Sequence, residues 1–149
     1  MNDDLLWTPT EHGWTAPIPE IQFCDVPLRI DVNTRPYPED EAVPAMSKAH
    51  HELVELILDN LPDVIDLAER EFRKYCDGTA LDSRTEGIKD PHIRIECPEP
   101  DDIAADGSYK IEPFEGESWA IVIGQKSSPD YAIHIEFDGT ELTDVWGGD

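Results

Sequence analysis

Residues 45–76 read AMSKAHHELVELILDNLPDVIDLAEREFRKYC, and this stretch decides the fold class. Its apolar residues recur at spacings of three and four, the period of one helix face. They are Ala49, Leu53, Leu56, Ile57, Val64, Leu67, Ala68, Phe72 and Tyr75. Asn60-Leu61-Pro62 interrupts the stripe, and proline is tolerated in a first helical turn but costly in an interior. The spacing predicts two helices, over about 47–60 and 62–76. One kinked helix is the alternative.

On both sides of this stretch the apolar residues alternate with polar ones, the period of a half-buried strand. Residues 1–20 contain three prolines and two tryptophans and read as extended chain with a short edge strand. Residues 21–32 read as one strand, or as two short ones around a turn at Cys24-Asp25-Val26-Pro27. The later strands are expected at His92–Cys97, Tyr109–Phe114, Trp119–Gly124, Ala132–Phe137 and Glu141–Trp146.

Two connections carry turn signals. Asp138-Gly139 favours a tight hairpin of type I′, which needs positive φ at both central residues. Residues 125–130 read as a looser hairpin connection. The pattern predicts an α+β fold, an antiparallel β-meander of about five to seven strands with a central helix pair, or one kinked helix, packed on one face. We expect residues 1–149 to form one domain, with an extended or edge segment at 1–20, helices within 45–76 and antiparallel strands within 92–146.

The charge is the unusual feature of the composition. The chain has 34 acidic and 11 basic residues and a formal net charge of −23, spread over both halves. Phosphate contacts need clustered Lys and Arg, so nucleic-acid binding is not expected. Anionic membrane surfaces are disfavoured for the same reason. A basic protein partner, a bound cation and simple solubility remain open interpretations.

The cysteines and the N-terminus indicate a compartment. Cys24, Cys76 and Cys97 are odd in number and none shares a C-x-x-C spacing, which argues against a disulfide framework and a zinc knuckle. The start is acidic, and no apolar segment suited to a signal peptide follows it. We expect a cytoplasmic protein without a cofactor.

One candidate constellation for chemistry is His134, Glu136 and Asp138, which alternate along one expected strand and so share a face. A His with two carboxylates suits a divalent metal or an acid–base pair. The plainer interpretation is the solvated side of an antiparallel strand. His92, Arg94 and Glu96 repeat the pattern, and would form a polar ladder with the first set if the two strands were neighbours.

The other candidates lack supporting context. The run His50-His51-Glu52 is no H-E-x-x-H motif, and adjacent residues on a helix do not face each other. Cys76 has no signature of a nucleophile, and we interpret it as a structural thiol. Neither a phosphate-binding glycine loop nor a G-x-S-x-G elbow occurs. Nothing in the sequence assigns an enzymatic reaction.

The terminal hairpin carries the candidate binding residues. They are Asp138, Glu141, Asp144 and Trp146. A Trp beside two glycines at a strand end can lie partly exposed and mark a contact patch. Dense carboxylates steer association with a basic protein and can imitate a phosphate backbone.

The order of elements carries a resemblance. A Trp-containing, Pro-rich start is followed by the strand Val26–Val32 and by a two-part helix that ends in Phe72-Arg73-Lys74-Tyr75. The chain then closes with Trp119, the strand Ala132–Phe137, Asp138-Gly139 and a final Gly-Gly-Asp. This layout resembles bacterial domains of unknown function, some of them near toxin–immunity loci. The chain departs from them in the Ser127-Ser128-Pro129 loop and in its acidity.

The resemblance implies a bacterial cytosolic protein with an immunity-like binding role, and it carries over no catalytic residue. The first hypothesis is therefore a protein-interaction module. The alternatives are a metal-binding or small-ligand-binding protein or enzyme that uses the His134/Glu136/Asp138 face, and a structural, oligomer-forming domain whose edge strand pairs with a second copy.

Overall fold

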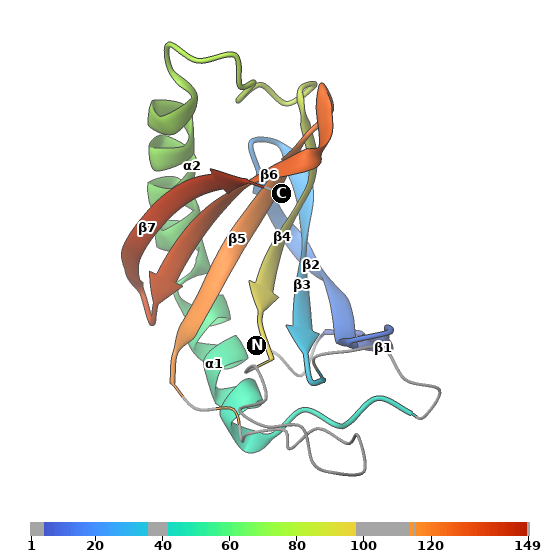
Figure 1. The fold of residues 1–149 in the computed structure, drawn as a ribbon. Coiled ribbons are helices and arrows are strands. Elements are labelled where there is room, and N and C mark those ends of the chain that lie inside the picture. The colour runs from blue at the N-terminus through green and yellow to red at the C-terminus, as the bar shows by residue number, and fades with distance from the viewer. Residues whose placement is uncertain (1–4, 36–41, 98–113, 115, 149) are drawn as a thin grey trace, which may run out of the picture.

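The computed structural model describes residues 5–35, 42–97, 114 and 116–148. Within them the chain forms one sheet and two helices (Figure 1). The strands are β1 (Thr8–Pro9), β2 (Gly13–Phe23), β3 (Val26–Asn33), β4 (Ile88–Ile95), β5 (Ser118–Gln125), β6 (Ser128–Asp138) and β7 (Glu141–Gly148). The helices are α1 (Lys48–Asp59) and α2 (Leu61–Cys76).

The seven strands lie side by side in chain order, from β1 at one edge to β7 at the other. The expected α+β class and the helix pair on one face are confirmed. The sheet is not wholly antiparallel, however, because β3 and β4 are parallel, with Ile30 opposite Ile93. The chain passes through both helices between these strands and so enters β4 in the direction of β3, as a crossover connection requires.

The core lies between the helices and one face of the sheet (Figure 1). One register row crosses the strands from β2 to β7 and points at the helices. Its members are Ala16, Ile30, Ile93, Ile121, Ile135 and Val145. The first five are fully buried and Val145 packs against them from the edge. Because side chains alternate along a strand, the residues between these positions point to the helix-free face of the sheet.

Two separate helices are present, as the stripe interruption predicted. Ser47 begins α1 with a capping box, in which its hydroxyl accepts the His50 N–H and the His50 ring accepts the Ser47 N–H. Asn60 ends α1, and α2 starts directly with Leu61 and Pro62. The proline stands in the first turn of α2, where its missing N–H has no intrahelical partner to lose.

The segment 1–20 was expected to be extended chain with a short edge strand, and this is only partly right. Residues 13–20 belong to β2, an interior strand that pairs with both β1 and β3. Pro17 is the last residue in register with β3 before the pairing lapses, and Pro19 lies inside the lapse between Pro17 and Gln22, where Glu20 has a φ of 63°. At such a bulge a missing N–H breaks no ladder bond.

The turn between β2 and β3 consists of Cys24 and Asp25, which have φ values of 47° and 67°. Positive φ at both central residues defines a type I′ hairpin. Two contacts hold this unusual backbone: the Glu69 carboxylate of α2 accepts the Cys24 N–H, and the Thr85 hydroxyl donates to the Cys24 carbonyl at 2.8 Å. The turn is therefore fixed to the helix layer.

The turn between β6 and β7 differs from the expected one by a residue. Asp138 is the last residue of β6 and pairs with Glu141, so the two central residues are Gly139 and Thr140. Only Gly139 has positive φ, at 62°, which is the type II′ pattern. The β5–β6 connection is also tighter than expected, because Gln125 already pairs with Ser128. The predicted strand Tyr109–Phe114 lies outside the described residues except for Phe114, which is not in a strand.

Candidate binding surface

Two register rows cover the helix-free face of the sheet. From β2 to β7, the first row contains Thr15, Asp31, Arg94, Ala120, Glu136 and Asp144. The second contains Pro17, Arg29, His92, Val122, His134 and Trp146. The basic residues therefore lie on β3 and β4, whereas the terminal hairpin of β6 and β7 contributes carboxylates, a histidine and a tryptophan. This face is divided by charge.

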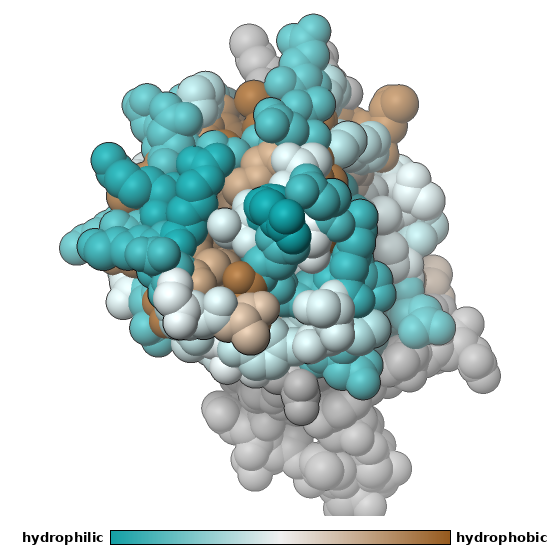
Figure 2. Space-filling model, turned by 90° about the horizontal axis from the view of Figure 1, so that it is seen from above, coloured by the Kyte–Doolittle hydropathy of each residue, from teal (hydrophilic) through white to brown (hydrophobic). Residues whose placement is uncertain are grey.

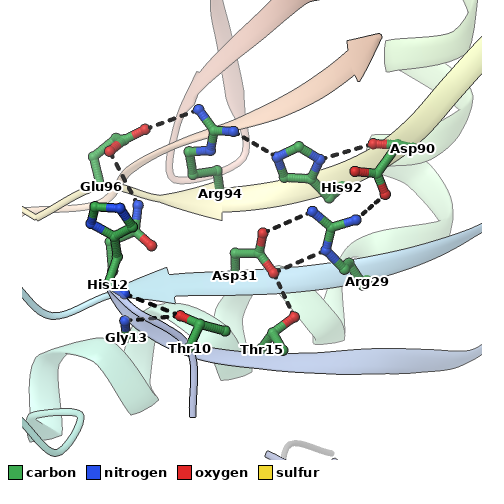
Figure 3. Close-up of polar contacts among 11 residues, drawn as sticks. Thr10, His12, Gly13, Thr15, Arg29, Asp31, Asp90, His92, Arg94 and Glu96 are labelled. Carbon is green, nitrogen blue, oxygen red and sulfur yellow. Dashed lines mark hydrogen bonds and ion pairs between the residues drawn. The ribbon is translucent and has the colours of Figure 1, made fainter. Parts of the chain in front are cut away.

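The β3–β4 half of this face carries polar side chains that hydrogen-bond and ion-pair with one another (Figure 3). The guanidinium of Arg29 donates to both carboxylate oxygens of Asp31, each at 3.1 Å, and also pairs with Asp90. Thr15 donates its hydroxyl to Asp31 at 2.6 Å. Because each charge here has a partner of opposite sign, this half of the face is nearly neutral.

His92 joins Asp90 and Arg94 along β4. Its Nε2 lies 2.9 Å from Nη2 of Arg94, and a guanidinium can only donate, so Nε2 accepts. The proton of the neutral ring is then on Nδ1, which donates to the Asp90 carbonyl at 2.9 Å. Burial lowers the pKa of His92. The buried, neutral ring thus fixes the position of Arg94 at the centre of the face.

The sequence suggested that His92, Arg94 and Glu96 would form a ladder with His134 and Glu136 if their strands were neighbours. They are not neighbours, because β5 lies between β4 and β6. Ala120 and Val122 of β5 separate the two polar sets. The polar residues of β4 face those of β3 instead, with Arg94 opposite Asp31 and also 3.5 Å from Glu96.

All the candidate binding residues lie on one face of the terminal hairpin. Asp138 is directly opposite Glu141, and Glu136 is directly opposite Asp144. Residues 128–148 contain five carboxylates and no Lys or Arg. Like charges placed directly opposite each other in an antiparallel pair are destabilising. The hairpin therefore maintains two unfavourable carboxylate pairs on one exposed face.

A pair of stacked rings lies on the same face, at the end of the hairpin away from its turn. His134 is opposite Trp146, and the two rings are stacked with centroids 4.0 Å apart. The indole is still 39% exposed, one of few large apolar side chains of the described residues to be so. Burial, and then the charge of Arg94, lower the pKa of His134. The His134 Nε2 is buried and has no hydrogen-bond partner among the described residues.

The predicted metal site at His134, Glu136 and Asp138 finds no support in the geometry. The three side chains do share a face, as expected, but they follow one another along a strand at about 6–7 Å per step. Among the described residues, no group of three His, Cys, Asp or Glu side chains lies close enough together to hold a metal ion.

A depression separates the two halves of the face. It has a volume of about 440 Å³ and lies over Ala120, the small residue of the first register row, between Arg94 of β4 and Glu136 of β6. Asp138 and Thr143 of the hairpin also line it. The acidic hairpin is therefore open to solvent on its inner side as well as on its outer edge.

The remaining sequence candidates are structural. His50 is buried, stacks on Phe114 at 4.4 Å and caps α1, so its Nδ1 is occupied. Burial raises the thiol pKa of both Cys24 and Cys76 to about 11, which makes them poor nucleophiles at neutral pH. Sequence reasoning did not single out Arg29 and Asp31, although their alternation with Leu28 and Ile30 was a usable signal.

The surface at one end of the molecule is largely hydrophilic (Figure 2). Figure 2 shows the end of the molecule that carries the α2–β4 connection and the β5–β6 turn, where apolar residues form only small separate patches. Neither helix of the described residues has the length and apolar character needed to cross a membrane. No protein-family model matches the chain, and comparison with curated proteins and with solved structures finds no match.

Proposed function

We propose that this protein is a protein-interaction module that binds a basic partner through the helix-free face of its β6–β7 hairpin. The observation that carries the proposal is the pairing of Glu136 with Asp144 and of Asp138 with Glu141, without a Lys or Arg from Ser128 to Gly148. Each pair costs stability in the isolated protein. A bound cationic side chain removes that cost, so the arrangement favours association with a basic surface.

The contrast with β3 and β4 supports this reading. On that half of the face, Asp31 is neutralised by Arg29 and Glu96 lies near Arg94. Among the described residues the hairpin carboxylates have no ion-pair partner, and Asp138, Glu141 and Asp144 are exposed. Uncompensated charge on an exposed surface steers an oppositely charged partner and raises its association rate. The proposed immunity-like role is inhibition of a basic toxin in the bacterial cytoplasm.

The test uses charge-reversal variants of the intact protein as bait in a lysate of the source organism. The hairpin variant is Glu141→Lys with Asp144→Lys. The matched control is Glu55→Lys with Asp66→Lys, which changes the net charge equally at two exposed positions on the helices. Retained proteins are quantified by mass spectrometry at low and high salt.

We expect a specific basic protein to be retained by the natural chain and by the control, and to be lost with the hairpin variant. High salt should release it, because the Debye length falls from about 10 Å at 0.1 M to about 3 Å at 1 M. Equal loss with both variants would show that only net charge matters. A partner that stays bound at high salt would contradict the electrostatic basis of the proposal.

A further inference from the structure

β7 is a long edge strand whose outer side no described strand pairs with along its whole length. The opposite edge of the sheet, β1, has two residues, whereas β7 has eight. No described strand pairs with the outer side of β7. An edge strand presents unpaired backbone N–H and C=O groups, which form a template for another extended chain. No described strand engages the outer main-chain groups of the hairpin proposed above as the binding surface, although the Val145 N–H donates to the Asp144 carboxylate at 2.9 Å.

The charges of β7 argue against a second copy of this chain as the occupant. Glu141 and Asp144 are exposed on β7, and every copy carries a net charge of −23. Pairing two such edges would place carboxylates against carboxylates, which is unfavourable in neighbouring strands. The same charges favour a strand that carries Lys or Arg.

The side chains of β7 define the pattern that a fitting strand needs. On the helix-free face, Glu141, Asp144 and Trp146 lie along the edge, and the exposed part of the indole suits a cation–π contact with Lys or Arg. On the opposite face, Leu142 and Val145 are half-buried and pack against the core. An added strand would complete their burial if its residues on that side were apolar.

We propose that the partner contributes an extended segment, with Lys or Arg alternating with apolar residues, that adds to the β7 edge as an eighth strand. This inference rests on the proposed function and specifies how the partner binds. Main-chain hydrogen bonds give such an association its affinity, and the alternating side chains give it specificity. Recognition of the partner thus depends on its conformation as well as on its charge.

The probe is a capped peptide as long as β7, in which Lys alternates with Val and Thr. The control is the same peptide N-methylated at every residue, which keeps the charge and side chains but cannot donate backbone hydrogen bonds. Binding of both to the intact protein is measured by calorimetry at low salt. Amide hydrogen exchange across residues 141–148 is followed with and without the peptide, and light scattering gives the oligomeric state.

We expect the unmethylated peptide to bind about tenfold or more tightly than the control, since the loss of a few net hydrogen bonds corresponds to at least that ratio. We also expect it to slow amide exchange in β7. Equal binding of both peptides, abolished by Glu141→Lys with Asp144→Lys, would overturn strand addition but leave the acidic binding face intact. Binding of neither peptide would overturn the inference. So would a dimer whose β7 amides are already protected, because the occupant would then be a second copy.

Discussion

The imidazole of His134 lies flat against the indole of Trp146, with ring planes inclined by only 6°. The two residues face each other across β6 and β7. A parallel aromatic pair of this kind contributes about 0.5–1.5 kcal/mol beyond the area that it buries. It holds Trp146 in one orientation at the edge of the sheet, although the indole is partly exposed.

The protonation of His134 should weaken the fold. Burial and Arg94 lower its pKa below the ordinary value of 6.5 that it has in the unfolded chain. The unfolded state therefore binds the proton more tightly, and the stability that His134 contributes is present above pH 6.5 and is lost as the pH falls toward the folded pKa. His134→Phe keeps a ring against Trp146 but cannot titrate.

The measurement is the free energy of unfolding in urea for both proteins at pH 7 and pH 5. The many carboxylates titrate alike in both and cancel in the difference. We expect the variant to gain stability relative to the natural chain at the lower pH. A difference that does not change with pH, or that changes in the opposite direction, would show that His134 has an unperturbed or raised pKa.

Neutralising one carboxylate of the hairpin should stabilise the protein. Asp144→Asn removes the like-charge pairing with Glu136, and we expect a gain of about 0.2–1 kcal/mol in the free energy of unfolding at low salt. The gain should shrink at high salt, where exposed charges are screened. Asp66→Asn on α2 is the control. Equal gains from both variants would mean that general charge repulsion, rather than the cross-strand pair, is being relieved.

The type I′ turn at Cys24 and Asp25 offers a second site for stabilisation. Asp25 is exposed and has a φ of 67°, a conformation that costs most residues about 1–2 kcal/mol. Glycine adopts this conformation without strain, but it also raises the conformational entropy of the unfolded chain, which offsets part of the gain. We expect Asp25→Gly to raise the free energy of unfolding by about 0.5–1 kcal/mol as the net result. Asp25→Val should lower it. Thermal unfolding of both variants checks the order, and a less stable glycine variant would contradict the assigned backbone.

Two glycines with positive φ should respond differently to alanine. At Gly139 a Cβ would lie 2.9 Å from the Glu117 carboxylate, whereas at Gly78 nothing lies within 4 Å. Both substitutions place an alanine in the left-handed region, which costs about 1–2 kcal/mol. We expect Gly139→Ala to destabilise more than Gly78→Ala in urea unfolding, because Glu117 must also move. Equal losses would indicate that the Glu117 side chain rotates away at no cost.

The sequence predicted local features well where one physical rule dominates. The three-and-four spacing with Pro62 predicted two helices, and alternation predicted the shared face of His134, Glu136 and Asp138. Neither rule says which strands are neighbours. The separation of His92 from His134 by β5, and the parallel pairing of β3 with β4, depend on how the helix pair packs, which no local pattern encodes.

In the candidate site, too, the sequence predicts the local features but not which residues are paired across strands. Alternation indicates that Glu136 and Trp146 are on strands, but their partners Asp144 and His134 follow from the register between β6 and β7. That register depends on the turn, where a shift of one residue from the expected Asp138-Gly139 to Gly139-Thr140 sets the pairing. A bulge between Glu136 and Phe137 then shifts it once more. Such irregularities arise from tertiary packing.

The parallel β3–β4 pair has a consequence for the order in which the protein folds. The pairs β1–β2, β2–β3, β5–β6 and β6–β7 join strands separated by short connections, and hairpins of this kind close within microseconds. Pairing β4 with β3 instead closes the long loop that contains both helices. The chain loses conformational entropy on this closure before the contacts between the two strands can stabilise it. We expect the chain to assemble first as an N-terminal three-stranded half and a C-terminal half. The docking of Ile93 beside Ile30 then sets the folding rate.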